Sequence, residues 1–239
     1  MIFKETYNPE IEDFTKEGKL SLSAVLKIFE NMGNRHSDLA GDSRFKYDGT
    51  ETAWVLTEWQ IQAESFPLYT DKIRAETWAE EVKSPLVAIR DFMLYKNDSV
   101  CIRGNSKWVL LDLKTQRLCR IGQEFIDKYQ PEPQTVFADS NFSKIKEPEN
   151  YSFEKRIQIR RSDFDFNNHI HNITYLDYAL ETIPEEVYKF LEFKNLRISY
   201  KTAIKDDKEV IGRYYEEAEK KVLGIYDDAN QLKAMVQIW

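Results

Sequence analysis

The first half of the chain shows a helical pattern followed by strand-like alternation. Between positions 20 and 33, apolar residues recur every three or four positions, which predicts a helix with Ser21 as its N-cap and Gly33 as its stop. These apolar residues are Leu22, Val25, Leu26, Phe29 and Met32. Strand-like stretches follow at 58–63, 73–77, 87–95 and 106–113. The pattern therefore predicts one helix followed by several antiparallel strands.

The second half restarts the same plan after a stretch without a sustained period. Residues 131–151 contain prolines among polar residues and are interpreted as a linker. The predicted domains on either side are 1–130 and 152–239. In the second domain a strand precedes a helix for which Asn172 is the candidate cap, and alternation then returns at 196–201 and again in the last residues of the chain. A duplicated helix-plus-sheet unit is the simplest account.

This order of elements indicates a fold class. A helix that follows a short first strand, with a long antiparallel sheet after it, is the order of the hotdog fold, in which the sheet wraps the helix. Two copies in one chain predict an α+β protein with a tandem (double) hotdog fold. The alternative is an α+β domain of another topology.

Composition and charge exclude several classes of protein. A chain of 239 residues that is 42% hydrophobic and 31% charged suits a soluble folded protein. It has no apolar run of the ~20 residues that span a bilayer and no apolar signal segment after Met1, so we expect a cytoplasmic location. A net charge of -7 and a pI near 5.2 argue against a general nucleic-acid binder. Because Cys101 and Cys119 form no C-x-x-C pattern and no glycine-rich phosphate loop is present, we expect no metal and no cofactor.

The candidate chemistry lies in the segment from Asp165 to Asn172. Two of the three histidines of the chain fall within it. In an extended segment, alternate residues project to one face, so Asp165, Asn167 and His169 would reach one substrate together. A carboxylate, an amide and an imidazole that converge on one substrate are suited to acyl hydrolysis. The alternative is that Asp and Asn are turn formers and helix caps, and that the segment is an ordinary loop.

Basic residues lie on both sides of this segment. We predict that they contact an acidic carrier or a phosphate-bearing group, because local positive charge attracts such partners despite a negative total. The predicted carrier-binding residues are Arg160, Arg161, Lys194, Arg197 and Lys201. The alternative is a set of solvated strand faces.

The motifs resemble those of one family. The segment from Asp165 to Tyr175, followed by Leu180-Glu181-Thr182-Ile183-Pro184, resembles the D-x-N-x-H-V-N-N-x-x-Y and L-E-S-x-P patterns of the acyl-acyl carrier protein (ACP) thioesterases, double-hotdog enzymes of plants and bacteria. Stretches of the first half resemble that family's first hotdog in the same order. They are Trp54–Thr57, Tyr69–Asp71, Thr77–Trp78 and Ser106–Asp112. The resemblance covers the whole chain.

The resemblance implies hydrolysis of the thioester between a fatty acyl chain and the phosphopantetheine arm of ACP. It makes Asp165, Asn167 and His169 the catalytic candidates and ACP the partner. Asn167 would polarise the carbonyl and His169 would take a proton from water. Asp165 would orient the imidazole or the water, or attack the carbonyl itself. These roles stay open at the level of sequence.

One position departs from the family pattern. Many plant members place Glu-Cys shortly after a Tyr on the next strand, and alignment through Tyr200 puts Ala203-Ile204 there. A papain-like Cys-His mechanism is therefore disfavoured. Candidates for a replacement carboxylate are Glu181 and the pair Asp206-Asp207.

The resemblance also implies an apolar pocket for the acyl chain in the N-terminal hotdog. The lining candidates are Leu22, Val25, Leu26, Phe29, Trp54 and Trp59. Ordinary core packing is the alternative for each of them. Three further functions remain open: an acyl-CoA thioesterase with the same site, a hotdog dehydratase that uses His36, and a non-catalytic module that binds acyl groups or carrier protein. A homodimer is also allowed.

Overall fold

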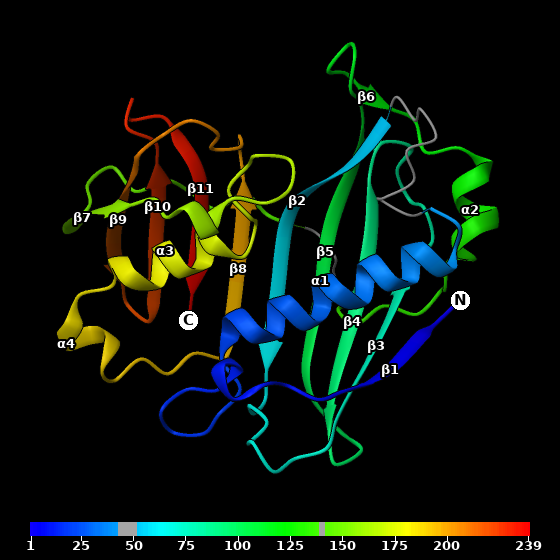
Figure 1. Ribbon diagram of the computed structural model, residues 1–239, viewed down its shortest axis with the longest axis horizontal. Coiled ribbons are helices and arrows are strands. Elements are labelled where there is room, and N and C mark those ends of the chain that lie inside the picture. The colour runs from blue at the N-terminus through cyan, green and yellow to red at the C-terminus, as the bar shows by residue number, and fades with distance from the viewer. Residues whose placement is uncertain (43–51, 139–141) are drawn as a thin grey trace. The chain divides into compact units, whose positions relative to one another are not determined.

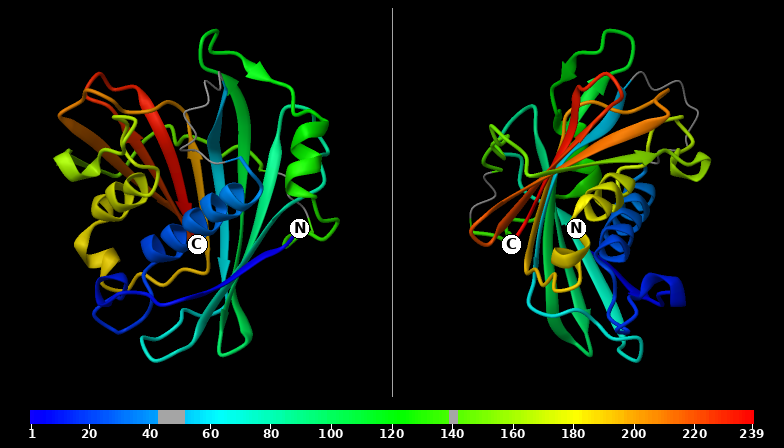
Figure 2. Two further views of the ribbon diagram at one scale, coloured as in Figure 1. Left: turned by 45° about the vertical axis from the view of Figure 1, so that its right-hand side comes forward. Right: turned by 90° about the vertical axis from the view of Figure 1, so that its left-hand side faces the viewer.

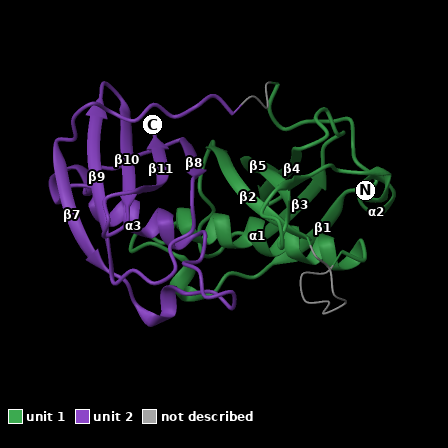
Figure 3. Ribbon diagram, turned by 90° about the horizontal axis from the view of Figure 1, so that it is seen from above, with its two compact units in different colours: residues 1–141 green, residues 142–239 purple. Residues whose placement is uncertain are grey.

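The structure, a computed structural model, describes residues 1–42, 52–138 and 142–239. It divides into two compact units, an N-terminal unit of residues 1–141 and a C-terminal unit of residues 142–239 (Figure 3). Each unit has an antiparallel sheet with one main helix packed on it (Figures 1 and 2). Among the described residues, no helix combines the length and the apolar character needed to cross a membrane.

The N-terminal unit contains most of the aromatic core. Its elements are β1 (Phe3–Tyr7), the 3₁₀ helix η1 (Ile11–Asp13), α1 (Leu22–Leu39), β2 (Thr52–Ala63), β3 (Ile73–Ala79), β4 (Ala88–Lys96), β5 (Ser99–Asp112), β6 (Leu118–Cys119) and α2 (Gln123–Tyr129). The strands pair in the order β1-β3-β4-β5-β2, and β6 pairs with β5. Phe29 of α1 packs on the sheet, with its ring centroid 4.8 Å from that of Phe92 and 6.4 Å from that of Trp59. A Cβ at Gly104 would stand 2.9 Å from the Phe29 ring, so the helix can come this close only over a glycine.

The prediction for this helix is confirmed at its start and wrong at its end. Ser21 is the N-cap, and its Oγ accepts a hydrogen bond from the backbone N–H of Ala24 at 3.1 Å. The helix continues through Gly33 to Leu39. Gly33 faces Arg90, whose Cδ lies 3.5 Å from the place of a Cβ, an ordinary contact distance, so Gly33 is an interior helix residue that packs against β4.

The C-terminal unit repeats this topology. Its elements are β7 (Phe153–Gln158), the 3₁₀ helix η2 (Arg161–Asp163), α3 (Thr174–Thr182), α4 (Glu185–Tyr188), β8 (Asn195–Tyr200), β9 (Glu209–Glu217), β10 (Lys220–Tyr226) and β11 (Leu232–Ile238). The order β7-β9-β10-β11-β8 matches that of the first unit, strand for strand. The predicted α+β double hotdog is therefore confirmed. The cap prediction was wrong, because α3 begins at Thr174 after Ile173 and Asn172 is not its N-cap.

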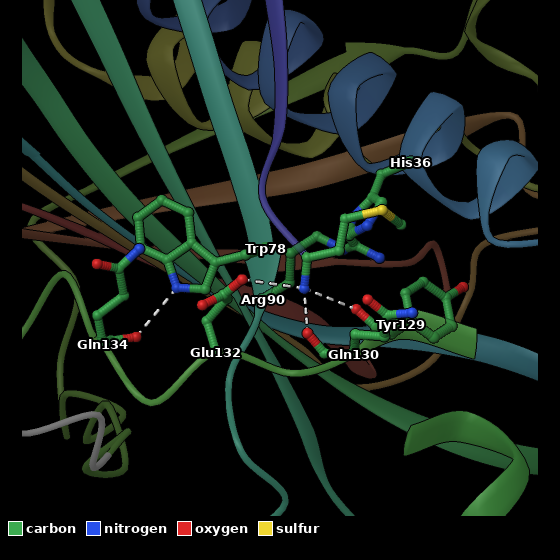
Figure 4. A network of polar contacts seen from close by, with 8 residues as sticks. His36, Trp78, Arg90, Tyr129, Gln130, Glu132 and Gln134 are labelled. Atoms are coloured by element: carbon green, nitrogen blue, oxygen red, sulfur yellow. Dashed lines mark hydrogen bonds and ion pairs between the residues drawn. The ribbon is translucent and has the colours of Figure 1, made fainter. Parts of the chain in front are cut away.

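The segment predicted as a linker is held by contacts at both of its ends. In the first part, the Trp78 indole N–H donates to the carbonyl of Gln134 at 3.0 Å, and Val136 N–H donates to the Asp91 carboxylate at 3.0 Å. Figure 4 shows Trp78 with Glu132 and Gln134 of this part. The Met1 amino group lies 3.1 Å from both the Tyr129 carbonyl and the Glu132 carboxylate. In the second part, which belongs to the C-terminal unit, a buried apolar residue and a tyrosine pair are the anchors. Ile145 packs with Val222 and Met235, and the Tyr151 and Tyr226 hydroxyls lie 3.0 Å apart.

Candidate active site

The catalytic candidates lie in a tight turn of residues 164–170, the C-terminal turn. Phe164 and Ile170 form an antiparallel bridge at its base. Asp165 N–H donates to the His169 carbonyl at 2.7 Å, and Asn168 N–H donates to the Asp165 carbonyl at 3.0 Å. The expectation of an extended segment is therefore wrong. Asn168 adopts a left-handed conformation (φ 58°), which asparagine tolerates better than most residues and which closes the turn.

Within this turn the Asp165 carboxylate organises its two neighbours. Its Oδ1 accepts the backbone N–H of Asn167 at 2.8 Å and that of His169 at 3.1 Å, and its Oδ2 accepts the Asn167 side-chain amide at 3.3 Å. The three candidates are thus brought together, but by the turn and not by alternation along a strand. Among the described residues the His169 imidazole has no hydrogen-bond or ion-pair partner, and it is partly exposed. It is available to a substrate or a water molecule.

The N-terminal unit contains the same turn without these side chains. In residues 14–20, the N-terminal turn, Phe14 bridges Leu20, and Thr15 N–H donates to the Lys19 carbonyl at 2.8 Å. Gly18, with φ 71°, takes the place of Asn168. When the two hydrogen-bond patterns are aligned, Thr15 corresponds to Asp165. Glu17 corresponds to Asn167, and Lys19 corresponds to His169. The turn is therefore a property of the fold, and the carboxylate, amide and imidazole are not needed to form it.

A buried carboxylate that the sequence analysis missed holds the base of the C-terminal turn. Asp163 is 2% exposed and accepts the Arg160 backbone N–H at 2.8 Å, the Arg160 Nε at 2.9 Å and the Tyr178 hydroxyl at 2.6 Å. Burial raises the pKa of Tyr178, and the adjacent Asp163 raises it further. Asp163 ties α3 to the turn. A signal was present in the sequence, because each turn begins at the Phe of an Asp-Phe pair, at Asp13-Phe14 and Asp163-Phe164.

The loop between β8 and β9 lies beside the turn. Ile170 N–H donates to the Ile204 carbonyl at 3.1 Å, and Ile204 N–H donates to the Tyr175 hydroxyl oxygen at 3.0 Å. Burial raises the pKa of Tyr175 to about 12. Ala203, the position of the missing family Glu, is exposed on this loop.

The candidates for a replacement carboxylate fall in different places. Glu181 lies in the last turn of α3, away from the start of that helix, and its carboxylate is 3.1 Å from Lys155 Nζ, so it does not join the C-terminal turn. Asp206 is exposed. Asp207 is partly buried, and burial together with the neighbouring Asp228 raises its pKa.

The acyl-chain candidates belong to the core of the N-terminal unit. Five of the six are buried, namely Leu22, Val25, Leu26, Phe29 and Trp59. Trp54 is partly exposed, and its indole N–H donates to Asp42 at 3.1 Å. A role in binding the acyl chain stays a prediction for all six.

The basic candidates differ in exposure. Arg161, Lys194 and Lys201 are exposed, and Arg160 is exposed although its Nε is bonded to Asp163. Arg197 is the exception, because it is only 7% exposed and donates to Ser143 Oγ at 3.0 Å. A side chain so buried does not contact a docking partner, so Arg197 is withdrawn from the carrier-binding set.

Two further nucleophile or base candidates are buried. His36 is fully buried, and its Nδ1 lies 2.7 Å from the Arg90 guanidinium. Burial and then Arg90 lower its pKa to about 3, and its partner is a guanidinium and not the carboxylate that a dehydratase pairs with an imidazole, which removes the basis for a dehydratase built on His36. Cys101 is also buried, and burial raises its pKa to about 11, so it is not a thiolate at neutral pH.

Two hotdog units in one chain, one of which carries a polar trio in its turn, define a double-hotdog protein. Comparison with known families identifies which one. The chain belongs to the acyl-ACP thioesterase family: the model of the acyl-ACP thioesterase N-terminal domain matches residues 1–129, and that of the C-terminal domain matches residues 146–234.

Individual relatives agree with this assignment. Oleoyl-acyl carrier protein thioesterase 2 of Arabidopsis thaliana is 30% identical over 208 residues, which cover 78% of this chain and 55% of the relative. The palmitoyl-acyl carrier protein thioesterase of Cuphea hookeriana is 24% identical over 215 residues, 84% of this chain and 51% of the relative. The chain thus spans about half the length of the curated relatives it matches.

Solved structures show the same fold. The 12:0-ACP thioesterase from Umbellularia californica has a TM-score of 0.88 at 16% identity, covering 99% of this chain and 96% of that chain. An acyl-ACP thioesterase from Bacteroides thetaiotaomicron has a TM-score of 0.85, also at 16% identity, with the same coverage of 99% and 96%. At this identity the likeness establishes the fold.

Proposed function

We propose that this protein hydrolyses the thioester of fatty acyl-ACP, releasing a free fatty acid and ending chain elongation in fatty acid biosynthesis. The observation that supports it most is the comparison of the two turns. The same backbone occurs twice, and only the C-terminal turn carries a carboxylate, an amide and an imidazole together. Family membership agrees with this proposal.

Each member of the trio has a role in this reaction. The His169 imidazole, which has no partner among the described residues, takes a proton from water as the water oxygen attacks the carbonyl carbon. The Asn167 amide donates to the oxygen on which negative charge develops. When the C–S bond breaks, the proton on His169 passes to the thiolate of the carrier arm. Asp165 holds the other two residues in place, and its use as an acceptor of two backbone N–H groups favours orientation over direct attack.

A hydrolysis assay tests the proposal and its closest rival. The purified protein is incubated with one acyl chain loaded on ACP and on CoA, and the free thiol is detected. We expect turnover of acyl-ACP with a higher kcat/KM than acyl-CoA. Preference for acyl-CoA would make the protein an acyl-CoA thioesterase, and no turnover of either would support a non-catalytic binding module.

The exposed basic residues give a second prediction. Arg160, Arg161, Lys194 and Lys201 should steer an acidic carrier protein toward the site, because long-range attraction between exposed charges is screened by salt. Raising the salt concentration should therefore raise KM for acyl-ACP more than KM for a short acyl-pantetheine substrate. Steady-state kinetics from low to high salt checks this, and parallel curves for both substrates would exclude steering.

A cytoplasmic location and a homodimer stay predictions.

A further inference from the structure

A shallow depression lies beside the C-terminal turn. Its lining includes Ile159, Arg161, Phe164, Asn168, Asp207 and Lys208, all from the C-terminal unit. We call it the β7–β9 depression, because Ile159 directly follows β7 and Lys208 directly precedes β9. It adjoins the proposed catalytic residues, since Asn168 stands between Asn167 and His169 in the chain.

The two basic residues come from chain segments that the backbone brings to this depression. Ile159 N–H donates to the Lys208 carbonyl at 2.9 Å, which continues the β7–β9 pairing and places Lys208 beside Ile159. Arg161 follows two residues later, at the start of η2. The depression thus extends from the C-terminal turn to the ends of two paired strands. Its apolar members, Ile159 and Phe164, are partly exposed.

In the part of the chain that the structure describes, Arg161 and Lys208 form no ion pair. Basic residues nearby form ion pairs: Lys155 with Glu181, Arg156 with Glu209, and Arg160 with Asp163. Arg161 and Lys208 are exposed, and within residues 1–42, 52–138 and 142–239 neither pairs with a carboxylate. The same depression holds one acid, Asp207, whose pKa is raised by burial and by the adjacent Asp228. With two cationic side chains against one carboxylate, the depression presents net positive charge to a ligand.

We propose that Arg161 and Lys208 bind the phosphate of the phosphopantetheine arm whose thioester is cleaved at the C-terminal turn. This rests on the proposed function and assigns one part of the substrate to named residues. A planar guanidinium and an ammonium are the usual protein partners of a phosphate. The arm links its thiol to the phosphate through two amides and a dimethyl-substituted carbon. Asn168 provides a polar contact for such a chain, and Ile159 with Phe164 provides an apolar one.

Three substrates with the same acyl chain separate the parts of the arm. Acyl-pantetheine lacks the phosphate, acyl-phosphopantetheine carries it, and acyl-ACP adds the carrier protein. The variants are Arg161→Gln, Lys208→Gln and the double variant. Lys205→Gln is the matched control, because Lys205 is an exposed lysine of the same loop that does not line the depression. Circular dichroism verifies that each variant is folded.

We expect each single variant to raise KM for acyl-phosphopantetheine about threefold to tenfold, which corresponds to the loss of one charged hydrogen bond at an exposed site. In the single variants, kcat and the KM for acyl-pantetheine should not change. Lys205→Gln should behave as wild type. Equal effects with and without the phosphate would overturn the proposal. An effect seen with acyl-ACP alone would also overturn it, because the two residues would then contact carboxylates of the carrier.

A binding measurement separates this proposal from the proposed function. Calorimetry with phosphopantetheine and with pantetheine, on the wild type and on the double variant, requires no hydrolysis. Tighter binding of the phosphorylated compound to the wild type, lost in the double variant, supports the phosphate site even if no thioester is cleaved. Equal binding of both compounds to the wild type contradicts it even if acyl-ACP is hydrolysed.

Discussion

Replacing His169 with alanine should lower kcat for acyl-ACP hydrolysis by about 10²–10⁴-fold, the usual cost of removing a positioned general base. Asn167→Ala should cost about 10²–10³-fold, because it removes a donor to the developing oxyanion. Asp165→Thr should also lower the rate strongly, since it removes the carboxylate that holds both neighbours. Single-turnover rates measure these effects on the chemical step.

The N-terminal turn supplies the controls for these variants. It forms the same backbone with Thr15, Glu17 and Lys19 in the equivalent places, so threonine at position 165 is compatible with the fold. Lys19→Ala and Glu17→Ala should leave the rate close to wild type, and thermal unfolding should show all variants folded. A wild-type rate in His169→Ala would end the proposed mechanism. So would a loss of rate in Lys19→Ala as large as that in His169→Ala.

Much of the fold follows from local pattern. The helical spacing after Ser21 and the cap formed by the Ser21 side chain depend only on residues close in sequence, and the structure contains both. The duplication is visible because both halves repeat one order of apolar periods. The end of α1 was not predictable in this way. Gly33 is a stop signal by local rules, yet the helix continues through it to Leu39, and Gly33 packs against Arg90 on β4, a residue distant in sequence.

The residue types of the site could be recognised in the sequence, but the geometry of the site could not be predicted from it. A carboxylate, an amide and an imidazole within five positions are a chemical signal that composition makes visible. The turn that brings them together depends on the Phe164–Ile170 bridge and on the bond from Ile170 to Ile204, which is 34 residues away. Arg197 shows a related limit. Alternation assigned Arg197 to one face of β8, but only the structure shows that this face is buried too.

The buried acid Asp91 gives the second large prediction. Asp91 is fully buried, accepts the Val136 N–H at 3.0 Å and lies near Glu80, which is also buried. Burial, and then repulsion from Glu80, raises the pKa of Asp91 well above the ~3.9 of an unfolded chain. As the pH rises above ~3.9, the unfolded state loses this proton while the folded state keeps it. Asp91 therefore makes the protein less stable as the pH increases, by up to about 1.4 kcal/mol per pH unit, until the raised pKa is reached.

Asp91→Asn should remove this dependence, because an amide keeps an oxygen for the Val136 N–H but does not titrate. Relative to wild type, the variant should gain stability steadily from pH 5 toward the raised pKa. Urea unfolding followed by tryptophan fluorescence measures the difference, since four of the five tryptophans, Trp54, Trp59, Trp78 and Trp108, lie in the same unit. Asp112→Asn is the control. Backbone hydrogen bonds lower the pKa of Asp112, so it is charged in both states above pH 5 and its replacement should shift stability equally at every pH. A constant difference for Asp91→Asn as well would show that Asp91 is ionised in the folded protein.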